Sequence, residues 1–112
     1  MTKNVISIDE GITAHEAAKI MTEKRISSLI VERENVPVGI ITEKDFVKKI
    51  CIKDLVSSKV KVGTIMSKIQ TYASPDMPVE VAVQRMVNHK IRRLPILSDG
   101  KVVGIVTVTD LA

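Results

Sequence analysis

The chain has 112 residues, of which 45% are hydrophobic and 27% charged, and its formal net charge is +4 at pH 7. This length suits one compact domain or two half-sized units that share a core, and no apolar run is long enough to span a membrane, so we expect a cytoplasmic globular protein. The positive charge suits an anionic partner, but an aromatic content of 2% excludes the stacking surfaces of most single-strand nucleic-acid binders, which favours small anions.

The first half of the sequence predicts a strand followed by a helix. Residues 5–8 form a short β-type run with alternate isoleucines on one face. Thr13 followed by Glu16 is a capping box, which predicts a helix that begins here and ends near Lys24 or Arg25. The apolar face of this helix is predicted to hold Ala14, Ala17, Ala18 and Met21.

A hairpin and a second helix are predicted next. Two β-type runs, 28–31 and 38–41, flank a polar turn at Glu34-Asn35. Thr42 then caps a helix that is predicted for residues 43–56. Its apolar face is predicted to hold Phe46, Val47, Ile50 and Leu55.

The second half repeats this order after a polar connection at 57–63 and a helical turn at 64–66. Pro78 suits the first position of a helix, because the ring fixes φ and that position needs no amide donor. A hairpin is predicted at 94–106, with a turn at 98–101. The helix between Pro78 and the hairpin is predicted to present Val79, Ala82, Val83, Met86 and Val87 on its apolar face.

A seven-residue stretch occurs twice, at 39–45 and at 104–110, and reads Gly, two aliphatic residues, Thr, two further residues and Asp. Shifting the chain by 65 residues aligns 41 columns without a gap, and nine are identical, whereas chance gives about two or three. We predict an internal duplication, with repeat 1 at 1–62 and repeat 2 at 63–112. The final helix of repeat 2 is truncated, so we expect that helix to come from elsewhere or the chain to be a piece of something longer.

A unit of this size, with two or three strands and one helix, cannot bury its own apolar face. We therefore expect an α+β fold in which the two repeats pack about a pseudo-two-fold axis. Such packing creates two equivalent clefts, and a cleft at a repeat interface is a natural ligand site.

The repeated Thr-x-x-Asp has two interpretations that do not exclude each other. In the structural one, the hydroxyl and the carboxylate satisfy free amides at a helix start, as in a capping box. In the functional one, the glycine lets the backbone approach a ligand, the threonine and the helix start bind phosphate, and the aspartate accepts hydrogen bonds from ribose hydroxyls.

The pattern resembles a pair of CBS domains, the repeat named after cystathionine β-synthase and paired in a Bateman module. The resemblance rests on the two Gly-hydrophobic-hydrophobic-Thr-x-x-Asp stretches, the strand entry at 92–96 and the helix start at 77–82, and it covers essentially the whole chain. It implies tandem β-α-β-β-α repeats, no catalysis, and regulatory binding of adenosine compounds such as AMP, ADP, ATP or S-adenosylmethionine. No further cofactor is implied.

Carried over residue by residue, the resemblance implies two ligand sites, each with residues from both repeats. One site is expected to contain Asp110, Thr107, Thr109, Ile105 and Arg93 with Ile12, Ala17, Ile26 and Ser27. The other is expected to contain Asp45, Thr42, Lys44, Ile40 and Ser28 with Met77, Ala82, Ile91 and Arg92.

The two sites differ at the strand entry, where repeat 2 has Arg93 and repeat 1 has Ser28. Arg93 matches the phosphate-binding arginine of the family, and a charge-assisted hydrogen bond contributes roughly 1.5 to 3 kcal/mol. We therefore expect the Asp110 site to bind phosphate-bearing ligands more tightly. Ile30, which stands where repeat 2 has Pro95, is a departure from the family pattern.

Other classes of function have weaker support in the sequence. His15, His89 and Cys51 are not at metal-ligand spacing, and no catalytic arrangement is visible. The basic segment 85–93 could contact a nucleic-acid backbone, although cations at a helix C-terminus are favourable on electrostatic grounds alone. A third alternative is an assembly module without a ligand, and we expect a homodimer and a regulated protein partner.

Overall fold

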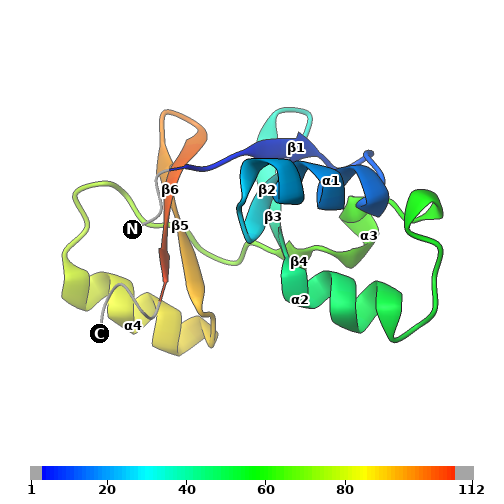
Figure 1. Cartoon of the computed structure of the whole chain (residues 1–112). Coiled ribbons are helices and arrows are strands. Elements are labelled where there is room, and N and C mark those ends of the chain that lie inside the picture. Colours follow the sequence, from blue (N-terminus) through cyan, green and yellow to red (C-terminus); the bar gives the residue numbers. More distant parts are fainter. Residues whose placement is uncertain (1–3, 108–112) are drawn as a thin grey trace. The chain divides into compact units, whose positions relative to one another are not determined.

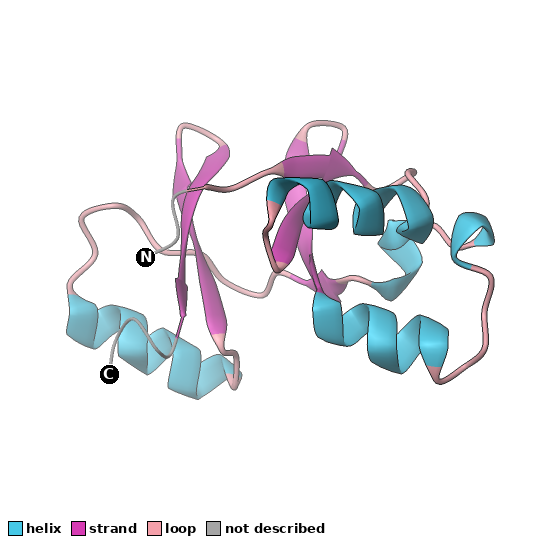
Figure 2. Ribbon diagram, viewed as in Figure 1, coloured by secondary structure: helices cyan, strands magenta, loops and turns pink. Residues whose placement is uncertain are grey.

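The computed structural model describes residues 4–107 and divides into two compact units. The N-terminal unit comprises residues 6–68, and the C-terminal unit comprises the described residues of 1–5 and 69–112. In the N-terminal unit several helices lie alongside a small β-sheet, and in the C-terminal unit one helix, α4, lies alongside a hairpin (Figures 1 and 2). The predicted α+β fold class is confirmed. No helix in this part of the chain is long and apolar enough to cross a membrane.

The N-terminal unit is built on a four-stranded sheet in the order β1-β2-β3-β4, with β1 parallel to β2 and the other pairs antiparallel. Its helices pack on the face that carries Leu29, Val31 and Ile41, where they bury the main core of the unit. In chain order the elements are β1 (Ser7–Asp9), α1 (Ala14–Lys24), β2 (Ser28–Arg33), β3 (Val36–Thr42), α2 (Glu43–Phe46), the π-helical turn η1 (Val47–Cys51), the 3-10 turn η2 (Ser57–Lys59), α3 (Val62–Ile65) and β4 (Ser67–Lys68).

The C-terminal unit consists of α4 (Val79–His89) and the antiparallel hairpin β5 (Arg93–Ser98) and β6 (Lys101–Thr107). An isolated parallel bridge joins Ala73 to Ile96. These two residues form the core of the unit together with Ala82, Met86 and Leu94.

The duplication predicted from the sequence is visible in the backbone. α1 and α4 are separated by 65 residues at both ends, as are the two hairpins. Each helix ends in a left-handed residue, Arg25 or Lys90, and each hairpin turns through two residues of positive φ, which is the geometry of a type I′ turn. A register shift lies at the same place in the first strand of both hairpins, before the turn.

Several element bounds differ from the prediction. β1 starts two residues later, Pro78 precedes α4 as its N-cap, and the predicted turn at 64–66 is the end of α3. β4 was not predicted, because two residues carry no readable alternation.

The prediction of a helix over 43–56 is wrong for its last five residues, 52–56. The helical backbone ends at Cys51, after a turn in which the amide of Ile52 donates to the carbonyl of Val47. Asp54 has a φ of 56° and reverses the chain. Val47 and Leu55 are 53% and 47% exposed, so they do not form the predicted apolar face.

Candidate functional site

The junction of β3 and α2 holds the first copy of the repeated stretch. The amide of Thr42 donates to Asp45 Oδ2 at 2.8 Å, and the arrangement is a capping box. Asp45 Oδ1 lies 3.0 Å from Lys49 Nζ, and the whole Asp45 residue is only 7% exposed. The structural interpretation of Thr-x-x-Asp is therefore confirmed in this copy, and both oxygens of the carboxylate already have partners.

Gly39 of the same stretch has a packing role. A Cβ atom at this position would lie 2.3 Å from the Met66 sulfur and 3.1 Å from the Ser67 carbonyl oxygen. The glycine therefore makes room for β4, which pairs with β3 at this point. In this copy the close approach is to the protein's own chain.

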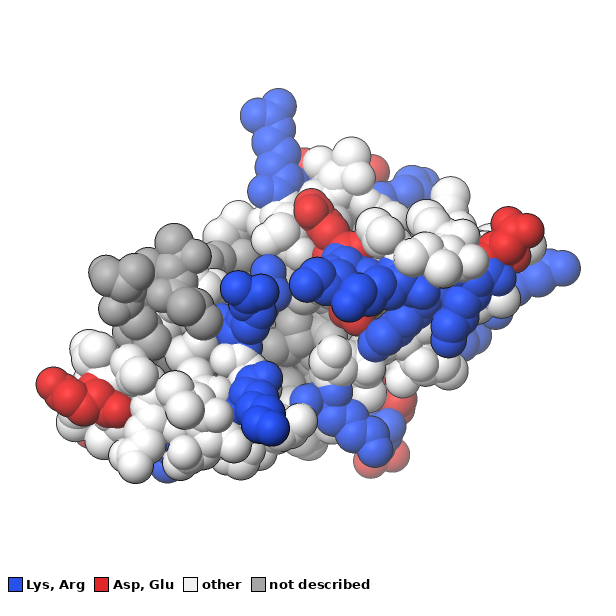
Figure 3. All heavy atoms as spheres, turned by 90° about the horizontal axis from the view of Figure 1, so that it is seen from below, with Lys and Arg blue, Asp and Glu red and all other residues white. Residues whose placement is uncertain are grey.

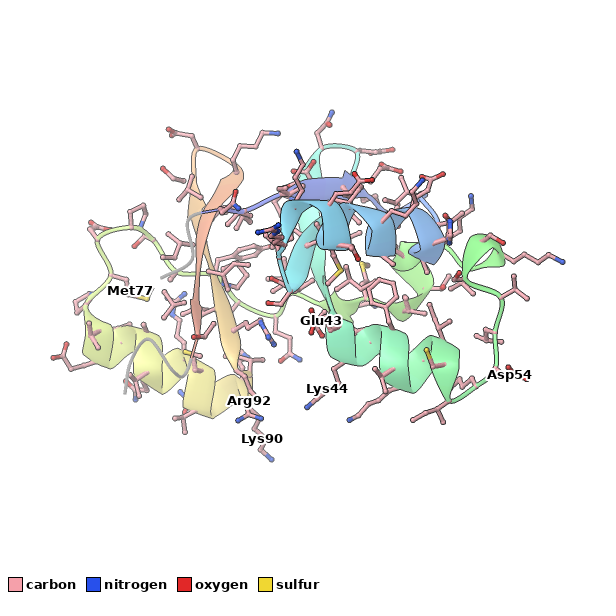
Figure 4. All side chains as sticks on the ribbon, viewed as in Figure 1. Glu43, Lys44, Asp54, Met77, Lys90 and Arg92 are labelled. Carbon is pink, nitrogen blue, oxygen red and sulfur yellow. The ribbon has the colours of Figure 1, made fainter. Side chains whose placement is uncertain are left out.

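The predicted ligand residues around this junction fall into one cluster. Ser28 and Thr42 are cross-strand partners, and Ile40 lies two residues before Thr42 on β3. The carbonyl of Ser27 accepts a hydrogen bond from the amide of Glu43 at 3.3 Å. Lys44 is exposed and points away from the first turn of α2 (Figure 4).

In the C-terminal unit, Arg93 and Thr107 are cross-strand partners at the open end of the hairpin. Both side chains are half-buried, and no carboxylate in the described part of the chain pairs with Arg93. Ile105 is buried opposite Pro95. Thr109 and Asp110 lie outside the described residues. The residues that carry a guanidinium and a hydroxyl are thus paired at one strand end, and a guanidinium is suitable chemistry for a phosphate group.

The remaining predicted site residues are spread over cores and surfaces. Ala17 has no exposed surface, so in this structure it serves packing. Ser27 and Arg92 are exposed, and Figure 4 shows Arg92 just before β5. The others pack in or against the core of their own unit, namely Ile12 and Ile26 in the N-terminal unit and Met77, Ala82 and Ile91 in the C-terminal unit.

The basic segment 85–93 includes a residue that serves the fold. Arg85 donates to the backbone carbonyl of Tyr72 and lies 3.4 Å from the Thr71 hydroxyl. Partial burial raises the pKa of the neighbouring Tyr72 hydroxyl. Because Arg85 is directed into its own unit, the segment offers fewer free cations to nucleic acid than its sequence indicated.

The sequence reasoning did not find Lys49. Its ammonium group joins Asp45 to the backbone, since it also donates to the carbonyl of Ile65 at 2.7 Å. The i, i+4 spacing of Asp45 and Lys49 was a readable signal, whereas the contact with Ile65 depends on tertiary structure. Among residues 4–107, no group of three or more His, Cys, Asp or Glu side chains is placed to hold a metal ion.

Comparisons with known proteins agree with the repeat. The family model of the CBS domain matches residues 1–52 and 62–112. An uncharacterized protein of Methanopyrus kandleri is 40% identical over 97% of the chain, which spans 57% of that protein. A CBS domain-containing protein of Bacillus subtilis, YhcV, is 32% identical over 100% of the chain and 79% of its own length. A hexameric CBS-CP12 protein from bloom-forming cyanobacteria has a TM-score of 0.85 at 34% identity, over 99% of this chain and 65% of that one.

Proposed function

Because the chain belongs to the CBS-domain family, whose paired domains form regulatory modules, we propose that it is a cytoplasmic, non-enzymatic module that binds an adenosine nucleotide such as AMP, ADP or ATP. The observation that carries the proposal is the pairing of Arg93 with Thr107 at one end of the β5–β6 hairpin. A guanidinium on this strand end supplies charge-assisted hydrogen bonds for a phosphate group.

The two copies are proposed to differ in affinity, for two reasons. The N-terminal unit has Ser28 where the C-terminal unit has Arg93, so it lacks the cation. In addition, a ribose that binds Asp45 has to compete with the Thr42 amide and with Lys49. The site that contains Arg93 is therefore proposed to bind phosphate-bearing ligands first.

Regulation is proposed to work by a population shift. A ligand favours the conformation to which it binds more tightly, by no more than the difference between its two affinities. The changed population then acts on a protein partner or on a second copy of the chain.

Calorimetric titration of the purified chain with AMP, ADP, ATP and S-adenosylmethionine tests the proposal. Saturable binding of one of the three nucleotides supports the proposal. Binding of S-adenosylmethionine alone would mean that the regulatory ligand is an adenosine compound without phosphate. If a folded chain binds none of the four, the proposed sensor function is wrong.

The alternative function is assembly, and the observation that favours it is an exposed apolar ridge on α4. Val79, Val83 and Val87 recur every fourth residue and are 58%, 38% and 68% exposed. The buried residues of the same helix, Ala82 and Met86, lie beside this ridge and pack in the core of the unit. We propose that this ridge packs against a second copy of the chain to form a homodimer, with or without a ligand.

Val83→Glu is expected to convert the dimer to a monomer at micromolar concentration, because it places an unpaired charge in an apolar contact, at a cost of several kcal/mol. Light scattering after size-exclusion chromatography measures the mass. Gln84→Glu is the matched control, since it adds the same charge at an exposed position of α4. A dimer that persists in Val83→Glu, or that is lost equally in both variants, would contradict the proposed interface.

A further inference from the structure

A basic pocket of about 350 Å³ lies wholly within the N-terminal unit. Four lysines line it, and they come from three short segments: Lys49 from η1, Lys53 from the loop that follows, and Lys59 and Lys61 from η2 and the start of α3. These segments are green in Figure 1. Leu55 and Ile65 form an apolar part of the pocket wall. The pocket involves none of the residues assigned above to the nucleotide sites.

The charge of this pocket is unbalanced, because none of the residues that line it is acidic. Lys49 is neutralised by Asp45 at 3.0 Å. In the described part of the chain, no carboxylate pairs with Lys53, Lys59 or Lys61. Among the charged side chains on the face shown in Figure 3, basic ones cover more of the surface than acidic ones. Three uncompensated cations around a concave surface raise the local potential for anions.

Lys49 fixes one wall of the pocket. Its ammonium group donates to the carbonyl of Ile65 at 2.7 Å, which ties η1 to the end of α3. On the opposite segment, the Thr64 hydroxyl donates to the carbonyl of Lys61 at 2.7 Å. Because this hydroxyl proton is already used, the contacts to an anion come from the lysine ammonium groups. Such point charges select for the number of negative charges more than for the shape of the ligand.

We propose that this pocket binds a small molecule that carries two or more phosphate groups. Its volume lies within the usual range for small-molecule sites, about 300 to 1,000 Å³. A concave site without aromatic residues fits a compact polyanion better than a nucleic-acid strand, which needs stacking surfaces. The inference is independent of the proposed nucleotide function.

The test is calorimetric titration of the full chain with inorganic triphosphate at low ionic strength. The pocket variant carries Lys53→Gln, Lys59→Gln and Lys61→Gln. The matched control carries Lys19→Gln, Lys24→Gln and Lys68→Gln, which removes the same charge from exposed positions elsewhere in the N-terminal unit. We expect saturable binding that the pocket variant weakens by about 100-fold or more and that the control leaves within about threefold. Urea midpoints equal to that of the wild type show that both variants fold.

Four outcomes would overturn the inference. The first is no saturable binding of triphosphate by the wild type. The second is an equal loss of triphosphate affinity in the pocket variant and the control, which would show that binding depends only on the net charge of the chain. The third is a loss on Arg93→Ala with none in the pocket variant, which would place the anion in the proposed nucleotide site. Pocket-dependent binding of a short RNA without binding of triphosphate would also overturn it, in favour of a nucleic-acid surface.

Discussion

Arg93→Ala is expected to weaken the binding of AMP by about 10- to 100-fold, which is the loss for one charge-assisted contact to phosphate. Arg93 is half-buried next to Thr107, and no described carboxylate competes for its guanidinium. It is therefore positioned for a ligand at little cost in reorganisation. Calorimetric titration of the variant beside the wild type gives the ratio of the two dissociation constants.

Ser28 supplies the matched comparison, since it has the equivalent place opposite Thr42 in the N-terminal unit. Ser28→Ala is expected to change the affinity of the site that contains Ser28 by less than about threefold, because the contact that the substitution removes is a neutral one. Ser28→Arg is expected to add a second binding event to the titration. An equal loss of affinity in Arg93→Ala and Ser28→Ala would contradict the proposed ranking of the sites.

Much of the fold could be predicted, because the relevant signals are local. The predicted N-cap of α1 is present, since the Glu16 amide donates to the Thr13 hydroxyl oxygen at 3.1 Å. The predicted turn at Glu34-Asn35 and its counterpart in the second hairpin are both present, each with two residues of positive φ. Duplication strengthened each local signal, since a pattern that occurs twice at one offset is harder to produce by chance.

The features that the sequence did not predict depend on tertiary contacts. Apolar periodicity placed Val83 and Met86 on one helix face, but only the structure shows that Met86 is in the core and Val83 is exposed. The predicted helix over 43–56 ends early, at Cys51, and Asp54 after it has a positive φ. A glycine is the usual sequence signal for such a residue, and here there is none. In the same way, the role of Gly39 depends on Met66, which a sequence reading does not bring near it.

Asp45→Ala is expected to lower the free energy of unfolding by about 2 to 3 kcal/mol. The substitution leaves the Thr42 amide without its acceptor and Lys49 without its counter-ion. The Lys49 side chain is 36% exposed, so water recovers part of the loss and the full cost of breaking a buried pair does not apply. Urea unfolding of the variant and the wild type measures the difference.

Asp45→Asn separates the cap from the charge, because its amide oxygen can still accept from the Thr42 amide. We expect it to cost about 1 kcal/mol, and we expect a double-mutant cycle with Lys49→Met to give a coupling energy of about 0.5 to 1 kcal/mol. If Asp45→Ala stayed within about 0.5 kcal/mol of the wild type, the carboxylate would not be holding this junction. A ligand would then be the better explanation for an aspartate at this position, and the N-terminal unit would become the stronger candidate for nucleotide binding. The stability of one variant therefore bears directly on which of the two copies is the better candidate for the proposed nucleotide site.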